Sequence, residues 1–175
     1  MHFLKVRVNI FNRREDRELN LANFDMDLAN NQLSQNSVEE RLQWAIDYFD
    51  QIVISSSFGL QTGVIIDVVY RRLKRQLPVI FLDTLYHFSE THALAGRFLE
   101  KYDLNLQIIR PPDAKNRTEF ENKYGHRLWE RDIERFHELT KLRQIKTVLK
   151  HRDAWITGIR RDQSQTRKSA RVLEW

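Results

Sequence analysis

Four short apolar runs mark the chain, and longer stretches with helical periodicity separate them. Each run is bounded by polar residues, glycine or proline. Near-continuous apolar strands that alternate with helices are typical of parallel sheets buried on both faces. The pattern therefore predicts an α/β fold, a twisted parallel sheet with helices on both faces, with strands at 52–55, 79–82, 106–109 and 154–157.

Helical patterns fill the intervals between these strands. From Leu21 to Phe49 apolar residues recur at helical spacing, and Ser37 followed by Glu40 has the spacing of a capping box. The remaining sequence predicts helices at 61–76 and 90–102, and two helices within 113–150 with a break at Tyr124-Gly125.

The N-terminal segment has a different pattern. Residues 3–10 alternate between apolar and polar, which fits either an edge strand or an appended arm. A charged stretch follows at 13–18. We therefore expect an N-terminal arm or extension at 1–20 and one α/β domain at 21–175.

A serine-rich turn follows the first predicted strand. Ser55, Ser56, Ser57, Phe58 and Gly59 lie between that strand and the next predicted helix. A helix N-terminus has unpaired backbone N–H groups and a partial positive charge, so this turn suits a phosphate or sulfate. An ordinary serine-capped strand–turn–helix fits the same residues. No Gly-Lys-Ser/Thr follows, so the turn is not a Walker loop.

Two further strands end in polar residues. Asp83-Thr84 could accept hydrogen bonds from a nucleoside or cap the next helix. The segment after the fourth strand contains Arg160, Arg161 and Arg167. Arginine is the preferred bidentate partner of phosphate and sulfate, although a solvated basic loop is the alternative interpretation of this segment. Parallel sheets bind ligands beyond the carboxyl ends of their strands, so three such ends favour an anion site. The fourth strand is followed by Gly158, Arg160, Arg161, Gln163, Ser164 and Arg167.

Composition narrows the possible functions. The 175 residues include 29 Lys and Arg against 24 Asp and Glu, a net charge of +5 that favours anionic partners. The absence of cysteine excludes disulfides, thiolate metal sites and a cysteine nucleophile within this chain. No run approaches the about 20 apolar residues of a membrane helix. The six histidines lack metal-site spacing, so we expect no bound metal. We also expect a cytoplasmic protein without a membrane partner.

Together these motifs resemble the assimilatory phosphoadenylyl-sulfate (PAPS) reductases, which have an adenine nucleotide α-hydrolase-like, Rossmann-like fold. The resemblance runs in family order over about 40–170. It is carried by Ser-Ser-Ser-Phe-Gly at 55–59, Phe-Leu-Asp-Thr at 81–84, Lys-Tyr-Gly at 123–125 with Leu-Trp-Glu at 128–130, and Ile-Thr-Gly-Ile-Arg-Arg-Asp-Gln-Ser at 156–164.

The resemblance implies a substrate, a partner and positions for the site. The ligand would be 3′-phosphoadenylyl sulfate or the product adenosine 3′,5′-bisphosphate, and thioredoxin would be the electron donor. Residues 55–59 would hold the phosphosulfate, Asp83-Thr84 would lie near the nucleoside, and the arginines near 160 would meet phosphates. Lys141 occupies the position of a family lysine, although Leu142-Arg143-Gln144 replaces the usual Val-Glu-Pro and Leu85 replaces a common glycine.

The resemblance also implies what this chain lacks. The family's catalytic cysteine, in a Glu-Cys-Gly motif near the C-terminus, has no counterpart here, and neither do the cysteine pairs of an iron–sulfur cluster. We therefore expect a sulfonucleotide-binding domain truncated at its C-terminus, with no catalytic residue of its own, no iron–sulfur cluster and no permanently bound cofactor.

Other classes of function remain open at this point. A nucleotide-sensing or partner-binding homologue without catalysis fits the changes at 142–144, and a homodimer is one assembly it could form. An ATP-using enzyme of the same fold group fits less well, because the serine turn lacks lysine and aspartate. Nucleic-acid binding has little support, since aromatic and basic residues are not interleaved.

Overall fold

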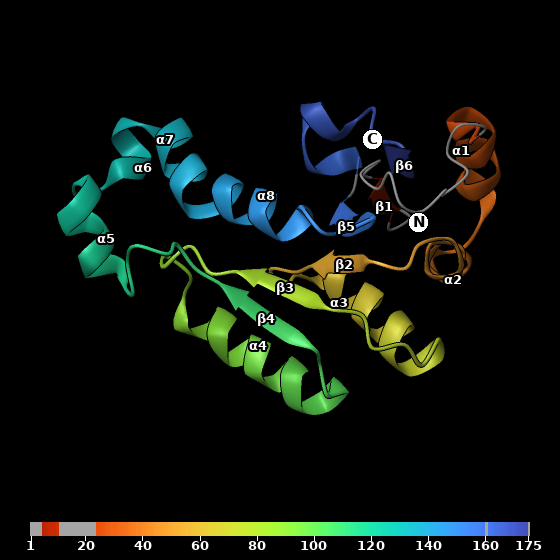
Figure 1. The fold of residues 1–175 in the computed structure, drawn as a ribbon, viewed down its shortest axis with the longest axis horizontal. Coiled ribbons are helices and arrows are strands. Elements are labelled where there is room, and N and C mark those ends of the chain that lie inside the picture. The colour runs from red at the N-terminus through yellow and green to blue at the C-terminus, as the bar shows by residue number, and fades with distance from the viewer. Residues whose placement is uncertain (1–4, 11–23, 160, 175) are drawn as a thin grey trace.

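The computed structural model describes residues 5–10, 24–159 and 161–174. In this part of the chain, six strands form one sheet in the order β4-β3-β2-β5-β1-β6 (Figure 1). The strands are β1 (Lys5–Ile10), β2 (Ile52–Ser55), β3 (Val79–Leu82), β4 (Leu106–Ile109), β5 (Ala154–Ile159) and β6 (Leu173–Glu174).

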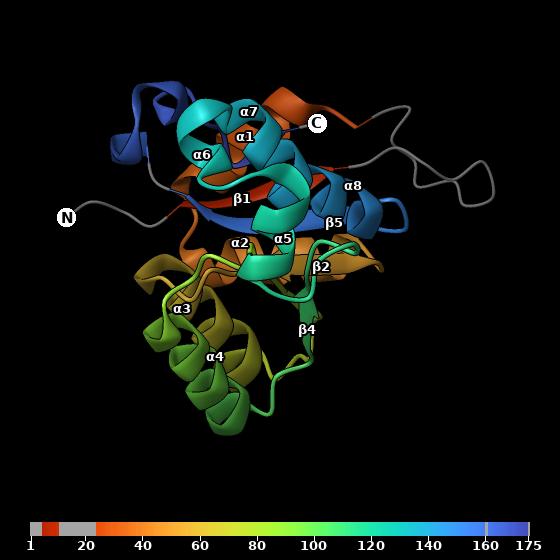
Figure 2. The ribbon, with the colours of Figure 1, turned by 90° about the vertical axis from the view of Figure 1, so that its left-hand side faces the viewer.

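Helices connect and cover these strands (Figure 2). Two π-helical turns, η2 (Val68–Arg72) and η3 (Glu138–Leu142), and two 3₁₀ turns, η4 (Arg161–Gln163) and η5 (Gln165–Arg167), accompany the α-helices. The α-helices are α1 (Met26–Gln35), α2 (Val38–Tyr48), α3 (Leu60–Asp67), α4 (Ser89–Tyr102), α5 (Arg117–Tyr124), α6 (Leu128–Arg131), α7 (Ile133–His137) and α8 (Arg143–Leu149).

The predicted parallel sheet is confirmed in its central part. β2 pairs in parallel with β3 and with β5, and β3 pairs in parallel with β4. β1 departs from the prediction, because it runs antiparallel to β5 and also pairs with β6. It is thus an internal strand and not an edge strand, with Val8 and Ile10 almost fully buried. The rest of the predicted arm, residues 1–4 and 11–20, lies outside the described residues.

Helices pack on both faces of the sheet, as the apolar strands predict. On one face, the core around Ile54, Phe81 and Ile156 includes side chains of α3 and α4. On the other face, Val53 and Ile80 pack with Ile145 of α8. Figure 1 shows α8 on the opposite side of the sheet from α3 and α4. Such two-sided burial explains why apolar residues point to both faces of these strands.

Local backbone chemistry sets the ends of the helices. The capping box is present at the start of α2, where Ser37 and Glu40 exchange hydrogen bonds. The helix predicted at 61–76 ends earlier, at Arg72, because Lys74 adopts a left-handed conformation with φ 52°. The break at Gly125 is present. The two-helix prediction for 113–150 is wrong, because further breaks at Arg127 and Asp132 divide this region into shorter pieces.

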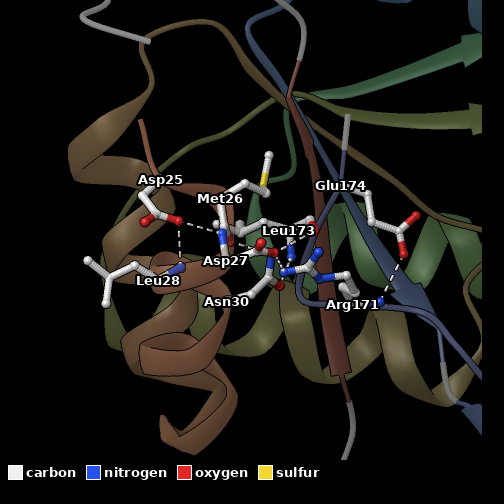
Figure 3. A network of polar contacts seen from close by, with 8 residues as sticks. All are labelled: Asp25, Met26, Asp27, Leu28, Asn30, Arg171, Leu173 and Glu174. Atoms are coloured by element: carbon white, nitrogen blue, oxygen red, sulfur yellow. Dashed lines mark hydrogen bonds and ion pairs between the residues drawn. The ribbon is translucent and has the colours of Figure 1, made fainter. Parts of the chain in front are cut away.

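A buried asparagine joins α1 to the sheet. The side chain of Asn30 donates to Leu173 O at 3.1 Å and accepts from Leu173 N at 2.9 Å (Figure 3). Nearby, Arg171 pairs with Asp27 at 2.5 Å. The Asn30 side-chain amide thus bonds both backbone groups of Leu173, as a neighbouring strand would do at this edge of the sheet. The C-terminal strand is therefore fastened to the first helix.

Candidate functional site

A cleft of about 500 Å³ opens at the carboxyl ends of β2 and β5. The strand order reverses at β2, because β3 lies on one side of it and β5 on the other. Parallel α/β sheets bind their ligands at such a switch point. The cleft is lined by Ser55, Ser56, Ser57, Gly59, Gln61, Thr62, Ile80, Leu82, His87, Lys141, Trp155, Thr157, Gly158, Ile159, Gln163 and Arg167.

The serine turn presents hydroxyl groups to this cleft. Ser55 is the last residue of β2, and its Oγ accepts a hydrogen bond from Trp155 Nε1 at 2.8 Å. Ser56 Oγ accepts from Phe58 N at 2.9 Å, which closes the turn. Phe58 itself does not line the cleft. It is 3% exposed, and its ring packs against rings of the core.

The N-terminus of α3 points its backbone into the same cleft. Gly59 is the residue before the first turn, and no side chain caps that turn. The free N–H groups and the helix dipole attract an anion there. Gly158 of β5 packs closely on this turn, since a Cβ at Gly158 would lie 3.1 Å from Gln61 Cβ and 3.2 Å from Thr62 N. A side chain at position 158 would therefore have to displace the start of α3 by a few tenths of an ångström.

Lys141 reaches the cleft from the α8 face of the sheet, opposite the face that α3 covers (Figure 1). It lies in the π-helical turn η3, directly before α8. The side-chain amide of Gln144 donates to Leu139 O at 2.9 Å and is buried beneath the turn. Isolated π turns inside helices are frequent at functional sites. The wider turn thus places a primary amine opposite the serine turn.

The segment after β5 contributes Gln163 and Arg167. Arg167 donates a hydrogen bond to Gln163 Oε1, and both residues line the cleft. Ser164 is exposed, bonds to Thr166 and is not among the residues that line the cleft. Arg161 lies in the turn η4, and Arg160 falls outside the described residues.

Asp83 and Thr84 lie deeper than the cleft. Both are buried, and neither is among the residues that line it. Asp83 accepts from Arg110 Nε at 2.8 Å and from Leu85 N at 3.0 Å. Burial raises the pKa of Asp83, but these hydrogen bonds and the charges of Arg110 and His92 outweigh it, so the pKa is lowered overall. The carboxylate thus serves an internal ion pair.

One buried hydroxyl in the cleft has no partner. Thr157 of β5 is 9% exposed, and its Oγ1 makes no hydrogen bond in the structure. A buried polar atom is normally paired, so an unpaired one that lines a cleft is suited to a ligand. Thr157 is one residue before the predicted Gly158.

Sequence reasoning missed several residues of the cleft. Trp155 reads as a core residue because it lies within an apolar strand. His87 comes from the loop after β3, and its Nε2 donates to Leu82 O at 3.0 Å. The alternation of β5 could have revealed Trp155 and Thr157, which share a face two residues apart. No periodicity marks His87.

The charges of the cleft are of one sign. Lys141 and Arg167 line it, and among the described lining residues none is Asp or Glu. The described part of the chain contains no group of three or more His, Asp or Glu side chains placed to hold a metal ion. It also contains no helix with the length and apolar character needed to span a bilayer.

A parallel sheet with an anion-suited cleft at its switch point is typical of α/β nucleotide-binding proteins. Comparison with known proteins specifies the family. The model of the phosphoadenosine phosphosulfate reductase domain matches residues 51–175. The chain therefore belongs to the phosphoadenosine phosphosulfate reductase family, as its motifs predict.

Individual relatives agree with this assignment. Over 151 residues the chain is 42% identical to a phosphoadenosine 5′-phosphosulfate reductase of Zymomonas mobilis, covering 83% of this chain and 60% of the relative. An adenosine 5′-phosphosulfate reductase of Halalkalibacterium halodurans is 37% identical over 150 residues, covering 83% and 62%. The chain thus spans about 60% of the length of these curated relatives.

A solved structure has the same fold. The PAPS reductase of Candida auris, determined as a phosphate complex, superposes with a TM-score of 0.66 at 31% sequence identity. The match covers 71% of this chain and 60% of that one. The α/β fold predicted from the sequence is confirmed by this likeness.

Proposed function

We propose that the cleft binds a sulfonucleotide, 3′-phosphoadenylyl sulfate, and its product adenosine 3′,5′-bisphosphate. One observation carries the proposal: the serine turn and the cations Lys141 and Arg167, far apart in sequence, line one cleft. Hydroxyls, helix N–H groups and cations all donate hydrogen bonds, which suits the oxygens of phosphate and sulfate. The volume is within the range of small-molecule sites. The phosphate complex of the Candida auris relative supports the same chemistry.

The chemistry of the cleft also favours binding without a divalent metal. Magnesium takes oxygen ligands and is usually held through one or two carboxylates together with phosphate oxygens. Asp83, the carboxylate that the sequence predicts at the site, is paired with Arg110 and does not line the cleft. The lack of a carboxylate in the described lining favours a sulfonucleotide over the alternative of an ATP-using enzyme, which needs magnesium with its triphosphate.

The proposed place of this chain in catalysis is substrate binding. A family reductase uses a cysteine thiolate to attack the sulfonate sulfur, and thioredoxin then releases sulfite. This sequence has no cysteine, and no other side chain is an equivalent nucleophile. We therefore expect the 175-residue chain to bind the sulfonucleotide without releasing sulfite when reduced thioredoxin is present. A cytoplasmic location is part of the same proposal.

The proposal includes no iron–sulfur cluster. Cysteines are the usual ligands of such clusters, and the sequence contains none. Phe136 and Leu139, which lie in the region of the family's cysteine pairs, are buried in a local core instead. Thr140 uses its hydroxyl to bond Phe136 O at 2.7 Å. Visible absorption of the purified chain tests this directly: a cluster would give a broad visible band, and we expect none.

Calorimetric titration with adenosine 3′,5′-bisphosphate tests the binding function. We expect binding that persists in EDTA and weakens as salt increases, because the contacts are ionic. Arg167→Met should weaken it by about tenfold or more, since a charge-assisted hydrogen bond is worth about 1.5–3 kcal/mol. Arg97→Met, at an exposed position on α4 outside the cleft lining, is the matched control.

Two outcomes would contradict the proposal. One is a folded chain that does not bind adenosine 3′,5′-bisphosphate at millimolar concentration. The other is binding of ATP that requires magnesium, which would favour the ATP-using alternative. Titration with AMP adds a measure of specificity, because it lacks the 3′-phosphate. Equal affinity for AMP would indicate adenosine 5′-phosphosulfate as the substrate, as in the Halalkalibacterium relative's name.

A further inference from the structure

The contact between Trp155 and Ser55 has a consequence for the direction of a hydrogen bond. Trp155 Nε1 lies 2.8 Å from Ser55 Oγ, across the pair of strands β2 and β5. An indole N–H can only donate, so Ser55 must accept this bond. The serine hydroxyl has a single hydrogen, which must then point away from the indole. Ser55 lines the cleft, so that hydrogen is available to a ligand there.

Ser56 is oriented in the same way by the backbone. Its Oγ accepts from Phe58 N at 2.9 Å, and a backbone N–H is likewise only a donor. Two neighbouring hydroxyls of the cleft therefore each accept a hydrogen bond from the protein and each retain a hydrogen to donate. Together they present donors to an oxygen that carries no proton, such as those of an ionised phosphate or sulfate.

The indole is held firmly enough to fix this orientation. Trp155 packs against the buried cluster of Val53, Ile80 and Ile145, on the α8 face of the sheet. A ring restrained by packing loses little additional freedom when a ligand binds, which makes the donor array preorganised. A serine without this partner could rotate its hydroxyl among three staggered positions.

We infer that Trp155 is a positioning residue, which sets the Ser55 hydroxyl as a hydrogen-bond donor to the anionic group of the ligand. This inference rests on the proposed function and adds the ligand class: the group that contacts Ser55 is a fully ionised oxyanion, which accepts hydrogen bonds and donates none. Trp155 does not itself touch the reacting atoms in this account. It acts through Ser55.

A double-mutant cycle tests this dependence. Adenosine 3′,5′-bisphosphate is titrated into the 175-residue chain and its Trp155→Phe, Ser55→Ala and doubly substituted variants. We expect each single change to weaken binding by about five- to tenfold, the size of one hydrogen bond. The double variant should bind about as weakly as Ser55→Ala alone, because the two side chains contribute one interaction. Trp129→Phe, outside the cleft, is the control.

Additive effects would overturn the inference, and so would unchanged affinity in Trp155→Phe. If the unsubstituted chain fails to bind, the proposed function is itself contradicted, so the two failures are distinguishable. A second measurement applies even if Trp155→Phe does not fold. In ¹⁵N spectra, the indole N–H resonance of Trp155 should move both in Ser55→Ala and on titration with inorganic phosphate, while that of Trp129 stays in place. If the chemical shift of the Trp155 indole N–H stays the same in Ser55→Ala and on titration with phosphate, the role of Trp155 is also refuted.

Discussion

At the scale of single residues, Phe58 shows how the core shapes the site. It has φ 57°, a conformation that bulky residues rarely adopt. The centroid of its ring lies 5.4 Å from the ring centroid of Phe81 and 5.5 Å from that of Phe98. Such strain persists only where packing outweighs it. The buried ring therefore holds the serine turn in its bent form, with the three preceding serines lining the cleft.

Phe58→Ala tests this anchoring role. We expect a loss of about 3–5 kcal/mol in the free energy of unfolding, as for other buried Phe to Ala changes, measured by denaturant titration. Affinity for adenosine 3′,5′-bisphosphate should fall as well, because the turn loses its anchor. Phe88→Ala is the matched control, since Phe88 is 79% exposed and should change stability by no more than about 0.5 kcal/mol. Similar losses for both variants would contradict the account.

Asp83 illustrates a residue whose place at a strand end was predicted, while its partner in the fold was not. Its position after β3 predicted either a nucleoside contact or a helix cap, and its carboxylate lies 2.8 Å from Arg110 Nε. Arg110 follows β4, twenty-seven residues further along, and no local pattern relates the two residues. Long-range pairing of this kind follows from the strand order, which a single sequence does not specify.

Replacing Arg110 should change how stability depends on pH. The folded-state pKa of Asp83 lies below its ordinary value. Stability from this carboxylate is therefore present above the unfolded pKa of about 3.9 and is lost as pH falls through the folded pKa. Because the Arg110 side chain is half-exposed, Arg110→Gln should cost only about 1 kcal/mol at pH 7.

The difference between Arg110→Gln and the unsubstituted chain should shrink as Asp83 becomes protonated. Urea unfolding between pH 3 and pH 7 measures this trend. Arg97→Gln, at an exposed position, is the control for removing a positive charge. A constant difference across this range would show that Asp83 is not the group responsible.

At the scale of elements, strands were more predictable than helices. The runs at 79–82 and 106–109 are strands with the predicted limits, because short, mostly apolar runs bounded by polar residues or proline are typical of strands. The region 113–150 was harder, since its breaks at Arg127 and Asp132 depend on backbone conformations that many residues can adopt. The π-helical turn at Lys141 likewise had no sequence signal.

Gln144 provides a test of that turn. Its amide bonds Leu139 O at 2.9 Å, while its Oε1 is buried without a partner. Gln144→Met removes both the bond and the unpaired oxygen, so we expect little net change in melting temperature. The turn should relax and displace Lys141, which weakens ligand affinity by about fivefold or more. Calorimetry and thermal melting together separate these effects, and unchanged affinity would contradict the positioning role.

At the scale of the whole molecule, the described residues include a small core that is separate from the two clusters on the faces of the sheet. Helices α5–α7 lie together at one end of the molecule (Figure 1). They pack around Phe120 and Phe136, with Tyr86 from the loop after β3. The ring centroid of Tyr86 lies 5.2 Å from the ring centroid of Phe136 and 5.9 Å from that of Phe120. Tyr86 thus joins helices α5–α7, which we call the helical arm, to the loop after β3. The turn η3, which contains Lys141, follows α7 directly.

Hydrogen exchange should reveal the arm as a separate unit. Small cores with few contacts open more readily than a central sheet. In Tyr86→Ala, amides of α5–α7 should exchange at least about tenfold faster, because each aromatic pair adds about 0.5–1.5 kcal/mol beyond its buried area. Amides of β2 and β5 should be little affected. Equal acceleration in both regions would show that arm and sheet unfold together.

The central claim is that the serine turn and the cations from η3 and η5 contact one anionic ligand. A crystal structure of the chain with adenosine 3′,5′-bisphosphate measures this most directly. The account predicts phosphate oxygens within hydrogen-bond distance of the Ser55 hydroxyl and the first N–H groups of α3, with Lys141 or Arg167 contacting the same nucleotide. A nucleotide bound elsewhere on the molecule, with the cleft empty, would contradict it.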